Sequence, residues 1–253
     1  MDQTGSPPNK PVNYFKGWMD ELRIWDKALN ATHIRQMMNQ QIIANGTAVR
    51  GEEVPIDIHG PDNDGFSNGV TDNDPLAWAN LVAYYRMDQI ACGNLLPYNG
   101  IGVDGKIKNI QTPQEQSAPL PYLTKAPGGD WYDLSSGTPW LYGDSVWDYP
   151  NSKGVNGATI DWNIVKSSHN LVSGNDNITL LGLLLDTSGT ELTIMNPTEA
   201  DNENNSGIGL FITHYLLLNG NIDLVGESQL IQKRYTINQF SESILDLASG
   251  GYI

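Results

Sequence analysis

The feature that most constrains this chain is a series of short apolar segments in its second half. NITLLGLLLD, ELTIMN and GLFITHYLLLNGNIDLVG are rich in Ile, Leu, Val and Thr, and Gly, Asn, Asp or Ser separates them at roughly regular intervals. Branched apolar residues bounded by turn formers are typical of β-strands. The rhythm of strand, polar turn and strand predicts an all-β module, either a sandwich or a solenoid whose successive coils stack.

The first half combines strands with one helix. Residues 17–26 alternate as a strand, and NLVAYYRMD (80–88) predicts another. Between them, Asn30 is a suitable N-cap for an amphipathic helix over about 31–44. Ile34, Met37, Met38 and Ile42 recur at helical spacing there, and Asn45-Gly46 is interpreted as the stop.

A change of composition indicates the domain boundary. Residues 111–130 are rich in Pro, Gly and Gln and are interpreted as a linker. We therefore expect one domain over 1–110 and a rung-like β-module over 131–253 that is truncated at its C-terminus.

Charge and cysteine content exclude several classes of protein. The 253 residues carry a formal net charge of -15, which disfavours nucleic acid and anionic lipid as partners. Cys92 is the only cysteine, so no internal disulfide or thiolate zinc cluster can form. No apolar run is long enough to insert into a membrane, and the N-terminus has no signal-peptide core. An extracellular role would therefore make the chain part of a longer protein.

The stretch GWMDELRIWDKALNATHIRQMM resembles the closing strand and helix of laminin-G-like, concanavalin A-type jelly-roll domains of bacterial surface proteins. LVAYYRMDQ and VDGKI (103–107) match the strands that follow, so the resemblance covers about residues 14–110. It implies a partial jelly roll with one amphipathic helix, preceding the β-module.

The second half resembles the β-rich region of very large secreted proteins of the Bacteroidetes, especially flavobacteria. GDSVWDYPNSKG, IDWNIVKSSHNL and LNGNIDLVGESQLIQ carry this similarity. The resemblance implies an extracellular location on the bacterial outer surface and a role in adhesion. It also implies flanking domains of the same long chain and the type IX secretion or gliding machinery as partners.

Asp20 and Glu21 are the first candidates for chemistry. Glucanases of the jelly-roll class carry catalytic carboxylates on one strand face, and retaining hydrolysis needs two of them close together. Here Arg23, not an acid, follows Glu21 on the same face. The catalytic pair is absent, and we expect a structural pairing of Glu21 with Arg23.

Two other groups are candidate binding residues. Aromatic residues after the linker can stack on sugar rings, and packing in a core or between modules is the favoured alternative. The candidate ligand contacts among them are Trp131, Trp140, Tyr142, Trp147 and Tyr149. An acidic loop offers hard oxygen ligands for calcium, the one cofactor expected, although a solvated loop is the alternative. Its four carboxylates are Asp62, Asp64, Asp72 and Asp74.

These observations predict a non-enzymatic segment of a secreted cell-surface adhesin that binds a glycan or another surface ligand and acts as a spacer. One alternative is a fragment of a polysaccharide hydrolase or lyase. The other is a purely structural stalk without a ligand.

Overall fold

The computed structural model describes residues 19–60, 75–88, 90–107, 117–143, 147–199 and 204–232, and the backbone of 244–247. Within these residues the structure is mainly β-sheet with a single α-helix, which confirms the all-β class. Residues 19–107 are called the N-terminal unit below, and residues 117–247 the solenoid.

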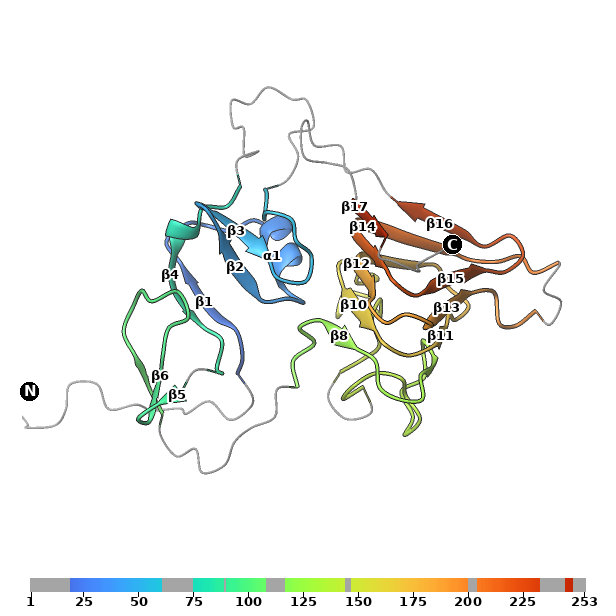
Figure 1. Ribbon diagram of the computed structural model, residues 1–253, viewed down its shortest axis with the longest axis horizontal. Helices are drawn as coiled ribbons and strands as arrows, with labels where there is room; N and C mark the ends of the chain where they lie inside the picture. Colours follow the sequence, from blue (N-terminus) through green and yellow to red (C-terminus); the bar gives the residue numbers. More distant parts are fainter. Residues whose placement is uncertain are drawn as a thin grey trace, which may run out of the picture.

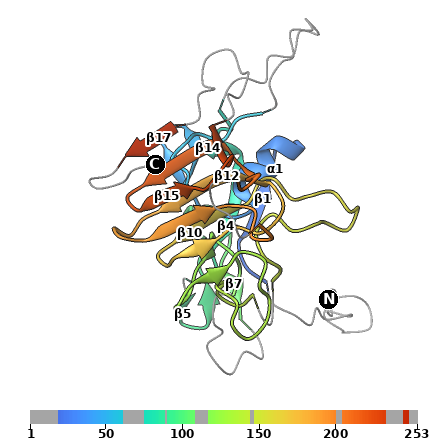
Figure 2. The same cartoon turned by 90° about the vertical axis from the view of Figure 1, so that its right-hand side faces the viewer.

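The solenoid consists of two sheets whose strand pairs are all parallel. Four successive coils contribute one strand to each sheet, and β16 and β17 both pair with β14 in the first sheet. The coils therefore stack as Figures 1 and 2 show, and the solenoid alternative holds over the sandwich. The first sheet contains β8 (Tyr122–Leu123), β10 (Ile164–Ser167), β12 (Ile178–Leu185), β14 (Gly209–Leu218), β16 (Gln229–Gln232) and β17 (Ile244–Leu247). The second sheet contains β9 (Gly129–Asp130), β11 (Leu171–Val172), β13 (Glu191–Ile194) and β15 (Asn221–Leu224).

The core of the solenoid lies between these sheets. Val165, Leu183 and Leu216 follow one another in register across β10, β12 and β14, and all three are buried. Seven of the eight residues of β12 are buried, because a parallel strand covered on both faces needs apolar side chains on both. That requirement explains the continuous apolar run ITLLGLLL.

The first coil begins earlier than the composition predicts. β8 and β9 lie within residues 111–130, the expected linker, and pair in parallel with β10 and β11. Residues 139–141 then cover the outer edge of β8 in the antiparallel direction: Leu141 N donates to Leu123 O at 2.9 Å and Lys125 N to Pro139 O at 2.7 Å. This short segment, called the cap below, closes the first edge of the sheet.

The N-terminal unit contains small antiparallel ladders. Strand β1 (Leu22–Trp25) pairs with β4 (Leu81–Tyr85), and the prediction of a strand in each of these segments is confirmed. The other elements are α1 (Ala31–Met37), the hairpin of β2 (Ile42–Asn45) and β3 (Ala48–Gly51), a 3-10 turn (Trp78–Asn80), and the meander of β5 (Ile90–Ala91), β6 (Asn94–Leu95) and β7 (Gly105–Lys106). The jelly-roll resemblance stays a prediction.

The helix is shorter than expected. Asn30 caps α1 as predicted, accepting from His33 N at 2.9 Å, but the helix ends at Met37 instead of residue 44. Ile42 begins β2, which ends at Asn45, and Gly46-Thr47 forms the two-residue hairpin turn with Gly46 at φ 59. Glycine is as typical of the first position of such a turn as of a helix end, and the cross-strand pairing decides between them.

The N-terminal unit packs against the outer face of the first sheet, beside β10, β12 and β14 (Figure 1). Val54 and Ile56 contact the apolar outer face of this sheet, which includes Ile164, Leu181, Leu184 and Tyr215. A Cβ at Gly182 would lie 2.6 Å from Val54 Cγ2, so only glycine leaves room for that valine. Asn163 Nδ2 donates to Asn39 Oδ1 at 2.7 Å within the buried contact. The two halves thus share one interface.

Candidate functional site

Two of the five aromatic residues proposed as ligand contacts are fully buried. Trp131 and Trp140 are both 0% exposed, and their rings meet edge to face with centroids 4.9 Å apart. Trp140 Nε1 donates to Trp131 O at 2.7 Å, and Trp131 Nε1 donates to Pro150 O at 2.9 Å. The prediction of ligand contact is therefore wrong for both, because they fill the end of the solenoid core beneath the cap.

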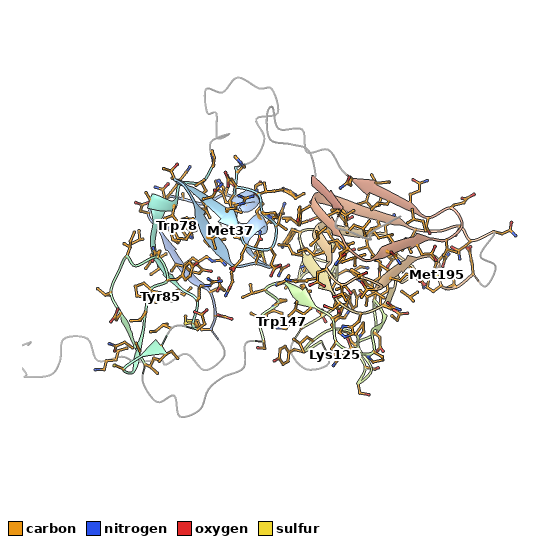
Figure 3. The ribbon with its side chains drawn as sticks, in the orientation of Figure 1. Met37, Trp78, Tyr85, Lys125, Trp147 and Met195 are labelled. Carbon is orange, nitrogen blue, oxygen red and sulfur yellow. The ribbon has the colours of Figure 1, made fainter. Side chains whose placement is uncertain are left out.

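The other three aromatic residues reach the surface. Trp147 is 39% exposed and lies between the two units in Figure 3; its Nε1 donates to Ser117 O, which fixes the orientation of the indole. Trp147 N also donates to Tyr142 O at 3.3 Å. Tyr142 is half-buried in the left-handed region at φ 61, and half-buried Tyr149 packs edge to face on Tyr132 with centroids 4.8 Å apart.

Two leucines beside this group were not predicted. Leu123 and Leu141 are 38% and 40% exposed and lie opposite each other where the cap pairs with β8. Strand alternation is the signal that could have found Leu123, since the neighbouring Tyr122 packs on the core.

Carboxylates lie near two tyrosines at the capped end of the solenoid. Burial raises the pKa of Tyr122 to about 12, and the negative charge of Asp148 contributes to that rise. Burial raises the pKa of Tyr132 to about 12 as well, with a contribution from Asp176. The described residues include no ion pair to Asp148 or Asp176. Acidic side chains therefore lie near both tyrosines.

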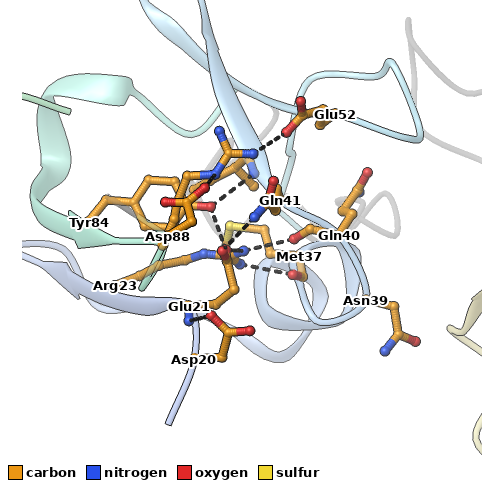
Figure 4. Close-up of polar contacts among 12 residues, drawn as sticks. Asp20, Glu21, Arg23, Met37, Asn39, Gln40, Gln41, Glu52, Tyr84 and Asp88 are labelled. Atoms are coloured by element: carbon orange, nitrogen blue, oxygen red, sulfur yellow. Dashed lines mark hydrogen bonds and ion pairs between the residues drawn. The ribbon is translucent and has the colours of Figure 1, made fainter. Parts of the chain in front are cut away.

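The Asp20-Glu21 pair belongs to a structural network (Figure 4). Arg23 Nη2 donates to Glu21 Oε2 at 2.5 Å, Tyr84 Oη donates to the same oxygen, and Gln41 Nε2 donates to Glu21 Oε1 at 3.1 Å. Both carboxylate oxygens are thereby engaged, and the predicted pairing of Glu21 with Arg23 is confirmed. Asp20 Oδ1 accepts from Glu21 N at 2.9 Å, a local backbone contact.

Arg23 carries the rest of that network. It donates to Met37 O at 2.8 Å and to Gln40 O at 2.7 Å, which are carbonyls at and beyond the end of α1, and it lies over the ring of Tyr84. Burial raises the pKa of Tyr84, so its hydroxyl stays a hydrogen-bond donor. The arrangement ties β1 and β4 to the helix end.

The expected calcium ligands Asp62, Asp64, Asp72 and Asp74 lie outside the described residues, so calcium binding stays a prediction. In the parts of the chain that the structure describes, no three His, Cys, Asp or Glu side chains gather as a metal site. Those parts also contain no helix long and apolar enough to cross a membrane.

Comparison of the chain with protein-family models, with curated proteins and with solved structures finds no match in any of the three. What the protein does must therefore be inferred from its own residues.

Proposed function

We propose that this chain is a non-catalytic module of a secreted bacterial surface protein, which binds a glycan or another surface ligand and holds it on a rigid spacer. The supporting observation is Trp147, an indole that is 39% exposed although its Nε1 is bonded to Ser117 O. A large apolar ring held in place on the surface binds at a low cost in conformational entropy.

The surroundings of Trp147 favour sugar over a purely apolar ligand. Leu123 and Leu141 extend the apolar area, and the exposed Asp148 supplies an acceptor for hydroxyl groups next to the ring. A few polar groups around an aromatic surface are typical of sites that orient a small ligand. The stacked coils hold these short segments in place.

The negative charge of the chain favours some classes of glycan over others. The chain carries a net charge of -15, and Asp148 has no cationic partner among the described residues. Sulfated or uronate-rich polysaccharides would be repelled by this surface. We therefore expect neutral or amino-bearing glycans as ligands.

The test is a titration of the full chain with neutral, amino-bearing and sulfated oligosaccharides, followed by calorimetry. Trp147→Ala should weaken binding about tenfold, roughly 1.4 kcal/mol, because stacking on the indole is lost. Ile90→Ala is the matched control, since Ile90 is 60% exposed on the N-terminal unit. Absence of binding to every glycan, or equal binding by Trp147→Ala, would contradict the proposal.

A ligand-free stalk is the second candidate, and the burial of Trp131 and Trp140 supports it because two of the five aromatic residues serve the core. A glycan panel without hits, together with an unchanged melting temperature in calcium, would favour the stalk. The proposal also includes export by a type IX system and display on the outer surface. Only the resemblance of the second half to secreted proteins of the Bacteroidetes supports that part. Surface labelling of the producing cells tests that part.

A further inference from the structure

The chain contains five Asn-Gly pairs, which begin at Asn45, Asn68, Asn99, Asn156 and Asn219. In such a pair the deprotonated backbone nitrogen of glycine can attack the side-chain carbonyl carbon of asparagine. A nitrogen–carbon bond forms, ammonia leaves, and water then opens the cyclic imide to aspartate or isoaspartate. Glycine has no Cβ to hinder the attack. The four pairs in the described residues differ in how firmly these groups are held.

At three of the pairs the attacking nitrogen is already engaged. Gly100 N donates to Pro97 O at 3.1 Å, Gly157 N to Gly154 O at 2.8 Å, and Gly220 N to Leu185 O at 3.1 Å. Each of these hydrogen bonds must open before the nitrogen can turn toward the side chain.

The asparagine side chains at these three pairs are engaged as well. Asn99 accepts from Tyr84 N and donates to Leu81 O at 2.7 Å, so both of its polar atoms hold strand β4. Asn219 Nδ2 donates to Asp186 O at 2.8 Å, and Asn156 Oδ1 accepts from Ala158 N at 3.1 Å. Asn99 and Asn219 are also partly buried, whereas Asn156 is exposed.

Asn45 differs from all three in the nitrogen of its glycine. Asn45 and Gly46 are exposed at the tip of the β2–β3 hairpin, and a Cβ at Gly46 would meet nothing within 4 Å. Gly46 N makes no hydrogen bond to any described residue. The side chain of Asn45 is held by one exposed contact, from Nδ2 to Asp57 Oδ1 at 2.9 Å.

We propose that Asn45 is a site of spontaneous deamidation in the folded protein. The reaction replaces an amide that donates to Asp57 by a carboxylate that repels it. Residue 57 pairs with Arg50 at the base of the loop that carries Val54 into the interface between the two units. Ageing of the protein therefore yields a more acidic form in which this hairpin is less firmly attached to the loop.

The experiment incubates the full folded chain at mildly alkaline pH and follows each Asn-Gly pair by peptide mapping and isoaspartate labelling. We expect Asn45 to convert at least about tenfold faster than Asn99 and Asn219, because hydrogen bonds must open there first. Asn156, exposed but with Gly157 N engaged, should be intermediate. The denatured chain is the control, in which these four pairs should convert at similar rates.

Asn45→Gln retains an amide but disfavours the five-membered ring. In a chain that also carries Asn68→Gln, it should abolish the first acidic form seen by ion-exchange chromatography. Asn156→Gln in the same Asn68→Gln chain, the matched variant, should leave that form in place. Conversion of Asn99 or Asn219 as fast as Asn45 in the folded chain would overturn the proposal. So would persistence of the first acidic form when Asn45→Gln and Asn68→Gln are combined.

Discussion

The solenoid and the N-terminal unit differ in how far strand ladders satisfy their backbone polar groups. In the solenoid, parallel neighbours extend from β8 to β16 along one sheet and from β9 to β15 along the other. The N-terminal unit has ladders of two or three strands, and amide side chains replace the missing strands. Gln36 donates to His59 O at 2.9 Å and accepts from His59 N at 3.3 Å, as a neighbouring strand would.

Two further amides in the N-terminal unit do the same. Gln40 Oε1 accepts from Val54 N at 2.9 Å, and Asn99 bonds both Tyr84 N and Leu81 O. A side-chain amide carries one donor and one acceptor group in the arrangement of a peptide unit, so it can end a ladder without leaving buried groups unpaired. The solenoid contains such amides as well: Asn151 bonds both Thr179 N and Thr179 O, but there they add to continuous parallel ladders. The N-terminal unit depends on them more, because its ladders have only two or three strands.

The largest expected effect falls on the capped end of the solenoid. Trp140→Ala should lower the free energy of unfolding by about 3–5 kcal/mol, because a fully buried indole leaves a cavity and Trp131 O loses its donor. Equilibrium unfolding in urea measures this change. Trp147→Ala removes the same side chain from an exposed position and should stay within about 0.5 kcal/mol.

The next effect concerns the contact between the two units. Gly182→Ala places a methyl group 2.6 Å from Val54 Cγ2 and should cost about 1–3 kcal/mol by overpacking. Val54→Ala frees that space, so the double variant should be more stable than the sum of the two single changes predicts. Strict additivity in this double-mutant cycle would contradict the packing of Val54 against β12.

A buried amide pair provides a polar test of the same interface. Asn39→Ala removes the acceptor of Asn163 Nδ2 and the donor to Pro119 O, and should cost about 1–3 kcal/mol. Asn45→Ala, at an exposed site, should cost less than about 0.5 kcal/mol. Equal losses in the free energy of unfolding for the two variants would show that the buried Asn39–Asn163 hydrogen bond contributes no more to stability than an exposed contact.

A pH effect is expected from the solenoid. Burial lowers the pKa of His214 in β14 to about 4 from its usual value of 6.5. Between these two pH values the imidazole is therefore protonated in the unfolded chain and neutral in the folded chain. The stability contributed by neutral His214 is present above pH 6.5 and is lost as the pH falls toward 4, on the order of 2–3 kcal/mol.

The variant His214→Gln should remove that slope, measured by urea unfolding across this range. His169→Gln is the comparison, since His169 lies in a turn after β10. A slope unchanged by His214→Gln would assign the pH dependence to other groups.

Much of the secondary structure of both units could be predicted from the sequence, because strand and turn chemistry are local. Three features that depend on near neighbours were predicted: the apolar run of β12, the strand β4 and Asn30 as the N-cap of α1. The helix end was not, since Ile42 fits both a helical stripe and a strand, and only its pairing with Gly51 decides.

The candidate site was predicted only in part for a similar reason. An aromatic residue in a β-rich chain fits a core or a surface equally well. Here its position relative to the cap determines whether it is buried. Trp140 lies in the cap and points inward, whereas Trp147 follows it and stays exposed. No local signal in the sequence indicates that Val54 meets Gly182.

The central claim is that the two units form one cooperative structure, with the N-terminal unit packed on the first sheet of the solenoid. Peptide-resolved hydrogen exchange across a urea series tests it most directly. We expect β2–β3 and β10–β14 to lose protection in one transition with one midpoint. Two separate transitions, with the N-terminal unit opening while the solenoid stays protected, would contradict it.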